Sequence, residues 1–292
     1  MSAGRTGVVI VNPHAGSERD TPEAIGAALA GLEVRSCEPN GLRAELERAV
    51  ADKAEVVAVA GGDGTMRSAA GVLAGTDSTM LPVPLGTFNH FARGIGIDTV
   101  EVAGEALERG TPTRIDLGEV DGEVFLNNAS IGWYAEMLQT RARLEKRIPR
   151  QLAKVVGLLA YLPKAPRFDV EVDGELYRTW LVWVGNGRYD MRVGHLSERV
   201  SVTEHRLDVR ILAADRRLAR FRAAWALMTG SMETSEALMR FTPTEATFRL
   251  AVPVGVDGDG VTLPAPLHFR SLPEALSVLP APGWKDEPDA DQ

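Results

Sequence analysis

The first third of the sequence alternates short apolar runs with alanine-rich segments, and this alternation limits the fold more than any other feature. Strand-length apolar runs separated by helical segments of about 10–15 residues are typical of parallel crossover units. We therefore predict a doubly wound, mostly parallel α/β domain over residues 1–115. Its strands are expected at Val8–Val11, Leu32–Ser36, Val56–Ala60, Met80–Pro84 and Ile115–Val120.

The pattern changes after Asp116, where alternating runs are separated by Asp-Gly and Asn-Gly dipeptides. These dipeptides are common hairpin turns, so residues 116–270 are predicted to form an antiparallel β-sandwich. Two helical insertions are expected, near Gln139–Leu162 and Arg216–Met239. Residues 271–292 are predicted to return to the first domain and to end in a disordered, charged tail. A chain of 292 residues is long enough for two domains.

Composition excludes several classes of protein. A net charge of -8 argues against nucleic acid as a partner. The one cysteine, Cys37, excludes an internal disulfide framework and a cysteine-based zinc site. The apolar run at the N-terminus is too short for a secretion signal, and the longest apolar stretch is shorter than the ~18–20 residues of a membrane span. A cytoplasmic protein is expected, peripherally associated with the membrane.

Three corners rich in glycine or asparagine follow predicted strands: "NPHAGS" at 12–17, "GGDGT" at 61–65 and "PLGTFNHFARG" at 84–94. Ligands of parallel sheets bind at the carboxyl ends of the strands. Glycine lets backbone N–H groups approach a phosphate, and a following helix adds its positive end. The sequence therefore predicts one phosphate site, although "GGDGT" alone is also compatible with a tight turn in which Asp63 caps a helix. Neither a Walker loop nor a G-x-G-x-x-G motif is present.

The order of the motifs resembles the diacylglycerol kinase catalytic-domain family, which includes bacterial lipid kinases and, more distantly, sphingosine kinases. The resemblance implies Mg²⁺-dependent phosphorylation of a lipid hydroxyl by ATP, with diacylglycerol as the favoured acceptor and phosphatidic acid as the product. A kinase of another lipid, a dinucleotide kinase similar to NAD kinases, and an inactive nucleotide- or lipid-binding regulatory module remain alternatives. The matching segments are "VVIVNPHAG", "VVAVAGGDGTM", "VPLGTFNHFARGIGI", "RIDLG", "FLNNASIG", "VGNGRY", "RLDVRIL" and "VDGDG".

The resemblance assigns nucleotide-binding roles to the three corners and to one further strand end. Asp63 is also assigned to the metal and to catalysis, because a bare carboxylate would repel a triphosphate whereas one that holds Mg²⁺ would attract it. Ser36 replaces a threonine that relatives use towards the nucleotide. The predicted nucleotide-binding residues are Asn12, Gly16, Ser36, Gly61, Gly62, Asp63, Gly64, Thr65, Thr87 and Asn89.

The predicted general base lies in "VDGDG". A lipid hydroxyl loses its proton as it attacks the γ-phosphoryl, and a positioned carboxylate can accept that proton. Asp257 matches the aspartate of the Asp-Gly-Glu motif of relatives, and Asp259 stands where the glutamate would be, so either is a candidate base. The same pattern also reads as a hairpin turn, as do "VDGEVF" at 120–125 and "VDGELY" at 172–177. Asp116 matches an acidic cleft position of the family, or is an aspartate at a strand end.

Several positions depart from the family pattern. Relatives usually carry GGDGT-x-Asn-Glu, whereas Arg67 and Ser68 follow Met66 here. His90 replaces an aspartate, as a proton shuttle or as a polar cleft residue. Glu204-His205 replaces Asp-Gly at a secondary magnesium site of some relatives. Glu204 is kept as a predicted metal ligand, while the loss of the glycine is expected to deform the loop.

The segment Arg141–Arg167 carries eight basic residues and one acidic residue, a net charge of +7 in a chain of -8. Apolar residues lie among these charges, and basic amphipathic segments bind anionic membrane surfaces. The segment is therefore predicted to dock on the membrane that holds the lipid substrate. A solvated face over a buried helix is the alternative. The oligomeric state stays open, a homodimer included.

Overall fold

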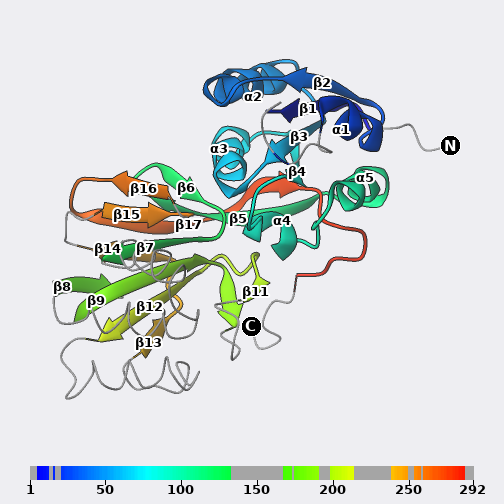
Figure 1. Cartoon of the computed structure of the whole chain (residues 1–292). Helices are drawn as coiled ribbons and strands as arrows, with labels where there is room; N and C mark the ends of the chain where they lie inside the picture. The colour runs from blue at the N-terminus through cyan, green and yellow to red at the C-terminus, as the bar shows by residue number, and fades with distance from the viewer. Residues whose placement is uncertain are drawn as a thin grey trace, which may run out of the picture. The chain divides into compact units, whose positions relative to one another are not determined.

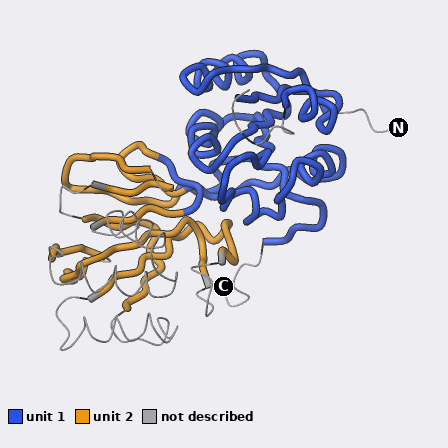
Figure 2. The backbone as a smooth tube through the Cα atoms, viewed as in Figure 1, with its two compact units in different colours: residues 1–117, 124–127, 272–292 blue, residues 118–123, 128–271 orange. Residues whose placement is uncertain are grey.

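The computed structural model describes two compact units of the chain (Figure 1, Figure 2). Unit 1 comprises residues 1–117, 124–127 and 272–292, and unit 2 comprises residues 118–123 and 128–271. Strands β5 (Thr113–Val120) and β17 (Leu267–Val278) each contribute residues to both units. The structure describes residues 5–12, 16, 21–132, 167–172, 174–190, 198–213, 238–248, 253–257 and 259–286.

Unit 1 is built on a parallel sheet with the strand order β17-β4-β3-β1-β2. Every residue of β3 and β4 is buried, as expected for strands of a parallel sheet covered on both faces. The C-terminal end of β17 pairs with β4, with Ser277 beside Thr79, so the last strand of the chain belongs to this sheet. The other strands are β1 (Gly7–Val11), β2 (Leu32–Ser36), β3 (Val56–Gly61) and β4 (Thr79–Pro84).

Helices cover both faces of this sheet, which confirms the doubly wound α/β prediction. Helices α1 and α5 pack together on one face, and α2 and α3 on the other (Figure 1). Thr21 and Thr99 cap α1 and α5, and each threonine hydroxyl accepts a hydrogen bond from a backbone N–H of the first turn. The helices are α1 (Pro22–Ala28), α2 (Leu42–Ala51), α3 (Asp63–Leu73), α4 (His90–Gly94) and α5 (Val100–Arg109), with a short 3-10 helix at Pro39–Gly41.

Strand β5 departs from the predicted parallel pattern. It pairs with β17 and with β6 (Glu123–Phe125) rather than with β1–β4. Asp121 and Gly122 both have positive φ and turn the chain back immediately after β5, so that β6 pairs with it.

Unit 2 is an antiparallel arrangement, as predicted, and its strands follow the order β16-β15-β7-β9-β8-β14-β17. Strand β12 pairs with β9 and β13, and β10 pairs with β11 in a separate two-stranded sheet. The strands are β7 (Asn128–Gly132), β8 (Phe168–Val172), β9 (Glu175–Asn186), β10 (Arg188–Asp190), β11 (Glu198–Ser201), β12 (Leu207–Ala213), β13 (Leu238–Phe241), β14 (Glu245–Phe248), β15 (Pro253–Val256) and β16 (Asp259–Thr262).

Both predicted helical insertions fall largely outside the described residues. The segment Gln139–Leu162 lies outside them entirely, and so does most of Arg216–Met239. The end of the second prediction is wrong, because Leu238 and Met239 begin β13 and pair with β12. Among the helices that the structure describes, none is long and apolar enough to cross a membrane.

Candidate functional site

The carboxyl ends of four parallel strands meet at one edge of the sheet in unit 1. In the strand register, Val11 lies beside Ser36 and beside Ala60, and Gly61 lies beside Pro84. The three predicted corners and Ser36 therefore start from the same edge. This is the position at which ligands of open parallel sheets bind.

The corners that follow β3 and β4 are in direct contact. A Cβ atom added to Gly86 would lie 2.5 Å from the Cα of Gly62, so the two backbones approach as closely as only glycine permits. A Cβ atom added to Gly61 would lie 2.6 Å from the side chain of Thr65. The N–H of Leu85 also donates to the carbonyl of Gly61 at 3.0 Å. The glycines of "GGDGT" and "LGT" thus join two corners into one surface.

Asn89 gives the corner after β4 its shape. Its backbone is left-handed, with φ 52°, a conformation that asparagine tolerates better than most residues. Its Oδ1 accepts from the N–H of Gly86 at 2.9 Å, and its Nδ2 donates to the carbonyl of Gly86 at 2.8 Å. The side chain predicted to contact nucleotide therefore closes the Gly86–Asn89 turn.

Asp63 is the first residue of α3, and the helix is capped by Gly62, so Asp63 is not the N-cap. Its Oδ1 accepts from the backbone N–H of Phe91 at 3.2 Å, which ties the "GGDGT" corner to α4. Its Oδ2 makes no hydrogen bond to any residue that the structure describes. A carboxylate with one oxygen left over, beside glycine corners and the first turn of a helix, fits a Mg²⁺ ion held with phosphates.

The remaining predicted nucleotide residues surround these corners. Thr65 is half-buried in the first turn of α3, and Thr87 is exposed. Gly64 accepts a hydrogen bond at its carbonyl from Ser68 Oγ at 3.0 Å, so the departure at residue 68 is used within α3. Three others lie at strand ends or in the first corner: Asn12 is half-buried, Ser36 is exposed, and Gly16 has φ 86°.

His90, the departure in the corner after β4, is the first residue of α4 and is exposed. Its ring stacks on Phe88, with centroids 5.5 Å apart and an interplanar angle of 4°. Phe88 is 64% exposed. The imidazole at position 90, where relatives carry an aspartate, thus stacks on an exposed aromatic ring.

Asp257 sits in the turn between β15 and β16, with Val256 paired to Asp259. Its φ is 47°, its N–H donates to the carbonyl of Asn128 at 2.9 Å, and its Oδ1 accepts from the N–H of Asn128 at 3.0 Å. "VDGDG" is therefore a hairpin turn whether or not it also carries the base. Asp259, the other candidate, is exposed at the start of β16.

The negative charge of Asp257 affects the pKa of a buried tyrosine, Tyr189. Burial raises the pKa of Tyr189 to about 12, Arg199 opposes this rise, and the negative charges of Asp257 and Asp208 add to it. Asp257 is thus electrically coupled to the interior of unit 2.

Asp116 lies inside β5 rather than at a strand end, and it is fully buried. Its Oδ1 accepts from the N–H of Glu274 at 2.9 Å, where Glu274 has a positive φ of 47°. Arg114 donates to the carbonyl of the same residue at 3.2 Å. The hydrogen bond from Glu274 to Asp116 thus stabilises the irregular backbone of β17 at Glu274.

Glu204, the predicted metal ligand, forms an ion pair with an arginine. Its Oε1 accepts from Arg188 Nε at 2.9 Å, and its side chain is only 8% exposed. His205 has φ 56°, a left-handed conformation that costs a residue other than glycine about 1–2 kcal/mol. The expected deformation of the loop stays a prediction. Within the described parts of the chain, no three His, Cys, Asp or Glu side chains gather as a metal site.

Sequence reasoning missed a group of arginines in unit 2. Arg188, Arg210 and Arg240 surround the carboxylates of Glu204 and Asp208. The motif "RLDVRIL" contains Asp208 and Arg210, but Arg240 comes from β13 and Arg188 from β10. The approach of Arg188 and Arg240 to these carboxylates has no signal in sequence spacing.

The chain thus consists of a parallel α/β unit with glycine corners and an antiparallel β unit. Residues 6–120 match the diacylglycerol kinase catalytic domain, and residues 133–280 match the YegS C-terminal NAD kinase beta sandwich-like domain. The chain is 30% identical over 296 residues to the probable lipid kinase YegS-like of Pseudomonas aeruginosa, with 94% of each chain covered. The chain belongs to this YegS-like family of lipid kinases.

One further relative and one solved structure are similar to this chain. The diacylglycerol kinase of Bacillus subtilis is 31% identical over 137 residues, which are 42% of this chain and 43% of that protein. A crystal structure of a diacylglycerol kinase from Bacillus anthracis has a TM-score of 0.68 at 19% identity, covering 98% of this chain and all of the other. This structural likeness shows a shared fold.

Proposed function

We propose that this protein transfers the γ-phosphoryl group of Mg·ATP to the free hydroxyl of diacylglycerol, giving phosphatidic acid. The observation that carries the proposal is the joined corner of Gly62 and Gly86 with the carboxylate of Asp63 beside it. Backbone N–H groups and the start of α3 suit phosphates, and the remaining oxygen of Asp63 suits a divalent cation. The Bacillus subtilis relative is called a diacylglycerol kinase, which supports this acceptor.

The proposed reaction assigns a role to each unit's aspartate. Bound Mg²⁺ supplies neutralisation of charge on the phosphates. Asp63 holds that ion at the glycine corners, and Asp257 accepts the proton of the lipid hydroxyl. The hydroxyl oxygen forms a bond to the γ-phosphorus as the bond to the ADP oxygen breaks. Asp259 is the other candidate acceptor of the proton.

Asp63→Asn tests the metal role. The amide oxygen can still accept from Phe91, so thermal stability should change little, while the loss of charge should abolish most turnover. Raising the magnesium concentration should restore part of the rate. The measurement is transfer of radiolabel from ATP to lipid in mixed vesicles, resolved by thin-layer chromatography. Asp98→Asn, which removes an exposed carboxylate of the same unit, is the matched control. Full activity of Asp63→Asn excludes the metal role.

The acceptor is tested by a panel in the same assay. Diacylglycerol, other lipids with a free hydroxyl, and NAD are offered separately with Mg·ATP. Label in diacylglycerol supports the proposal, and label in NAD assigns a dinucleotide kinase. The absence of ATP consumption with every acceptor assigns a regulatory binding module.

We also propose that Arg141–Arg167 docks on an anionic membrane surface. The proposal rests on its charge of +7, and all of it except Arg167 lies outside the described residues. Each Lys or Arg near such a surface contributes about 1 kcal/mol, and the attraction weakens as the Debye length falls from ~10 Å at 0.1 M salt to ~3 Å at 1 M.

The triple variant Arg147→Glu, Arg150→Glu and Lys154→Glu should lose vesicle binding in a sedimentation assay while its ATP affinity is unchanged. The matched control makes the same change of charge at three arginines of unit 1: Arg43→Glu, Arg48→Glu and Arg109→Glu. If the two triple variants bind vesicles equally, or if vesicle binding does not depend on salt, the segment is a solvated face over a buried helix.

A further inference from the structure

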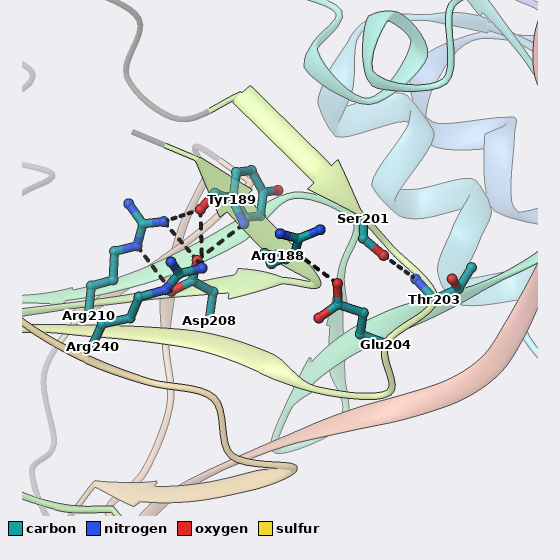
Figure 3. A network of polar contacts seen from close by, with 8 residues as sticks. All are labelled: Arg188, Tyr189, Ser201, Thr203, Glu204, Asp208, Arg210 and Arg240. Carbon is teal, nitrogen blue, oxygen red and sulfur yellow. Dashed lines mark hydrogen bonds and ion pairs between the residues drawn. The ribbon is translucent and has the colours of Figure 1, made fainter. Parts of the chain in front are cut away.

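We infer that guanidinium groups replace the second magnesium ion predicted at Glu204, so that unit 2 keeps its shape without a metal. The contacts that carry this inference form the polar network of Figure 3. The carboxylate of Glu204, the predicted metal ligand, is engaged by Arg188. The nearby carboxylate of Asp208 is engaged by Arg210 of the same strand and by Arg240 of β13.

The carboxylate of Glu204 is already neutralised. Arg188 Nε lies 2.9 Å from Oε1, and the two side chains are 25% and 8% exposed, Arg188 being the more exposed (Figure 3). Ion pairs shielded from water in this way are hard to exchange for another cation, because the displaced arginine would lose its carboxylate partner in a partly buried position. The negative charge of Glu204 is therefore already balanced by Arg188 and is not available to a divalent ion.

The carboxylate of Asp208 is saturated at both oxygens. Arg210 donates from Nε to Oδ1 at 3.0 Å and from a terminal nitrogen to Oδ2 at 2.7 Å. Arg240 makes the same two contacts at 3.1 and 3.0 Å, and the N–H of Tyr189 donates to Oδ2 at 3.2 Å. A carboxylate has about four lone-pair sites, and five donors already share them. With Asp208 only 1% exposed, a metal ion has neither an acceptor nor access.

The charges of this cluster also oppose a divalent cation. Arg188, Arg210 and Arg240 face two carboxylates, which leaves one net positive charge among these five groups. Arg210 is held further by the ring of Trp183, whose centroid lies 5.1 Å from the guanidinium carbon. A magnesium ion would add two positive charges beside it and would be repelled.

The arginines perform the cross-linking that a metal would otherwise supply. Arg210 and Arg240 both donate to the carbonyl of Tyr189, at 2.6 and 3.2 Å, while Asp208 accepts from its N–H. Both backbone groups of Tyr189 are thereby fixed to side chains of β12 and β13 (Figure 3). Paired forks of this kind are geometrically specific, so they hold β10 in one position.

The first experiment measures thermal unfolding of the full chain without nucleotide, in EDTA and in magnesium, for the wild type, Glu204→Gln and Asp208→Asn. We expect the magnesium-dependent shift in Tm to be the same in the wild type and Glu204→Gln. A shift that both share arises at another site and supports the inference. If the wild type shows a magnesium-dependent shift in Tm and Glu204→Gln does not, the metal binds at Glu204 and the inference is overturned. The same holds for Asp208→Asn if that variant folds.

The second experiment tests the cross-link. Arg240→Leu should lower Tm by roughly 5 °C, because it removes one fork from a buried carboxylate. Arg178→Leu is the matched control, since Arg178 of β9 is 58% exposed and pairs at 3.0 Å with Asp169 of β8, whose carboxylate is also exposed. Exposed pairs of this kind contribute little. An equal, small loss in the two variants means that the arginines do not hold β10, and overturns the inference.

Discussion

Two turns of this protein, at Asp121 and at Asp257, have aspartates of the same backbone conformation and differ in their surroundings. Both carry the sequence Val-Asp-Gly, and their aspartates have φ values of 46° and 47°. Asp121 exchanges two hydrogen bonds with the backbone of His268, at 3.2 and 3.3 Å. Asp257 exchanges the same two with Asn128, at 2.9 and 3.0 Å. The carboxylate in each turn closes the contact with the next strand.

The difference lies in burial and charge. Asp121 is exposed, whereas Asp257 is half-buried and its negative charge helps to raise the pKa of Tyr189. A partly desolvated carboxylate coupled to other charges is the kind of group that enzymes use as a base. The comparison shows that a Val-Asp-Gly turn by itself specifies a hairpin, and that its chemistry depends on what surrounds it.

The largest expected difference between the two turns is in turnover. Asp257→Asn should lower lipid phosphorylation by roughly 10²–10⁴, the usual contribution of a general base, with ATP affinity near that of the wild type. Asp121→Asn, which removes the same charge from the same kind of turn, should leave turnover unchanged. Asparagine suits both turns, so folding is preserved. If Asp257→Asn keeps full turnover and Asp259→Asn loses it, the base is Asp259; if both keep it, "VDGDG" is a hairpin alone.

A smaller difference is expected in stability. Alanine at either position loses the acceptor and disfavours the left-handed backbone, which costs about 1–2 kcal/mol of unfolding free energy. Asp257→Ala should be the more destabilising, because Asn128 is half-buried whereas His268 is exposed and water can satisfy its N–H. Denaturant unfolding measures both values. The reverse order would show that burial of the partner does not distinguish the turns.

The smallest difference is expected in the titration of Tyr189. Asp257→Asn removes a charge that raises the pKa of Tyr189, so this pKa should fall below about 12, while Asp121→Asn should leave it unchanged. Phenolate absorbance measures it, and Tyr189→Phe assigns the signal. An equal response to both substitutions would mean that Asp257 is not electrically distinct from Asp121.

The same titration has a consequence for stability. The folded-state pKa of Tyr189 lies above its unfolded value of about 10. The stabilisation linked to neutral Tyr189 is therefore fully present below pH ~10 and is lost as pH rises towards 12. In Asp257→Asn this loss should be smaller, because the two pKa values are closer.

Much of unit 1 could be predicted because its signals are local. Apolar runs of four to six residues predicted β1–β4 to within a residue or two of their observed bounds. The close approach of the corners could be predicted from glycine itself, because glycine lacks a Cβ atom. The residues concerned are Gly61, Gly62 and Gly86. Asp63 stands out in the sequence as a charge among those glycines. The hydrogen bond between Asp63 and the N–H of Phe91 could not be predicted, because it joins the segments that follow two different strands.

Sequence by itself determined the order of strands, helices and turns, since hydrophobic period and turn chemistry act over a few residues. Tertiary structure decided what each polar side chain does. It directed Asn89 to its own turn, Asp116 to the backbone of Glu274, and three arginines to Glu204 and Asp208. A carboxylate's role depends on the charges and donors within a few ångströms of it, and these come from strands far apart in the chain.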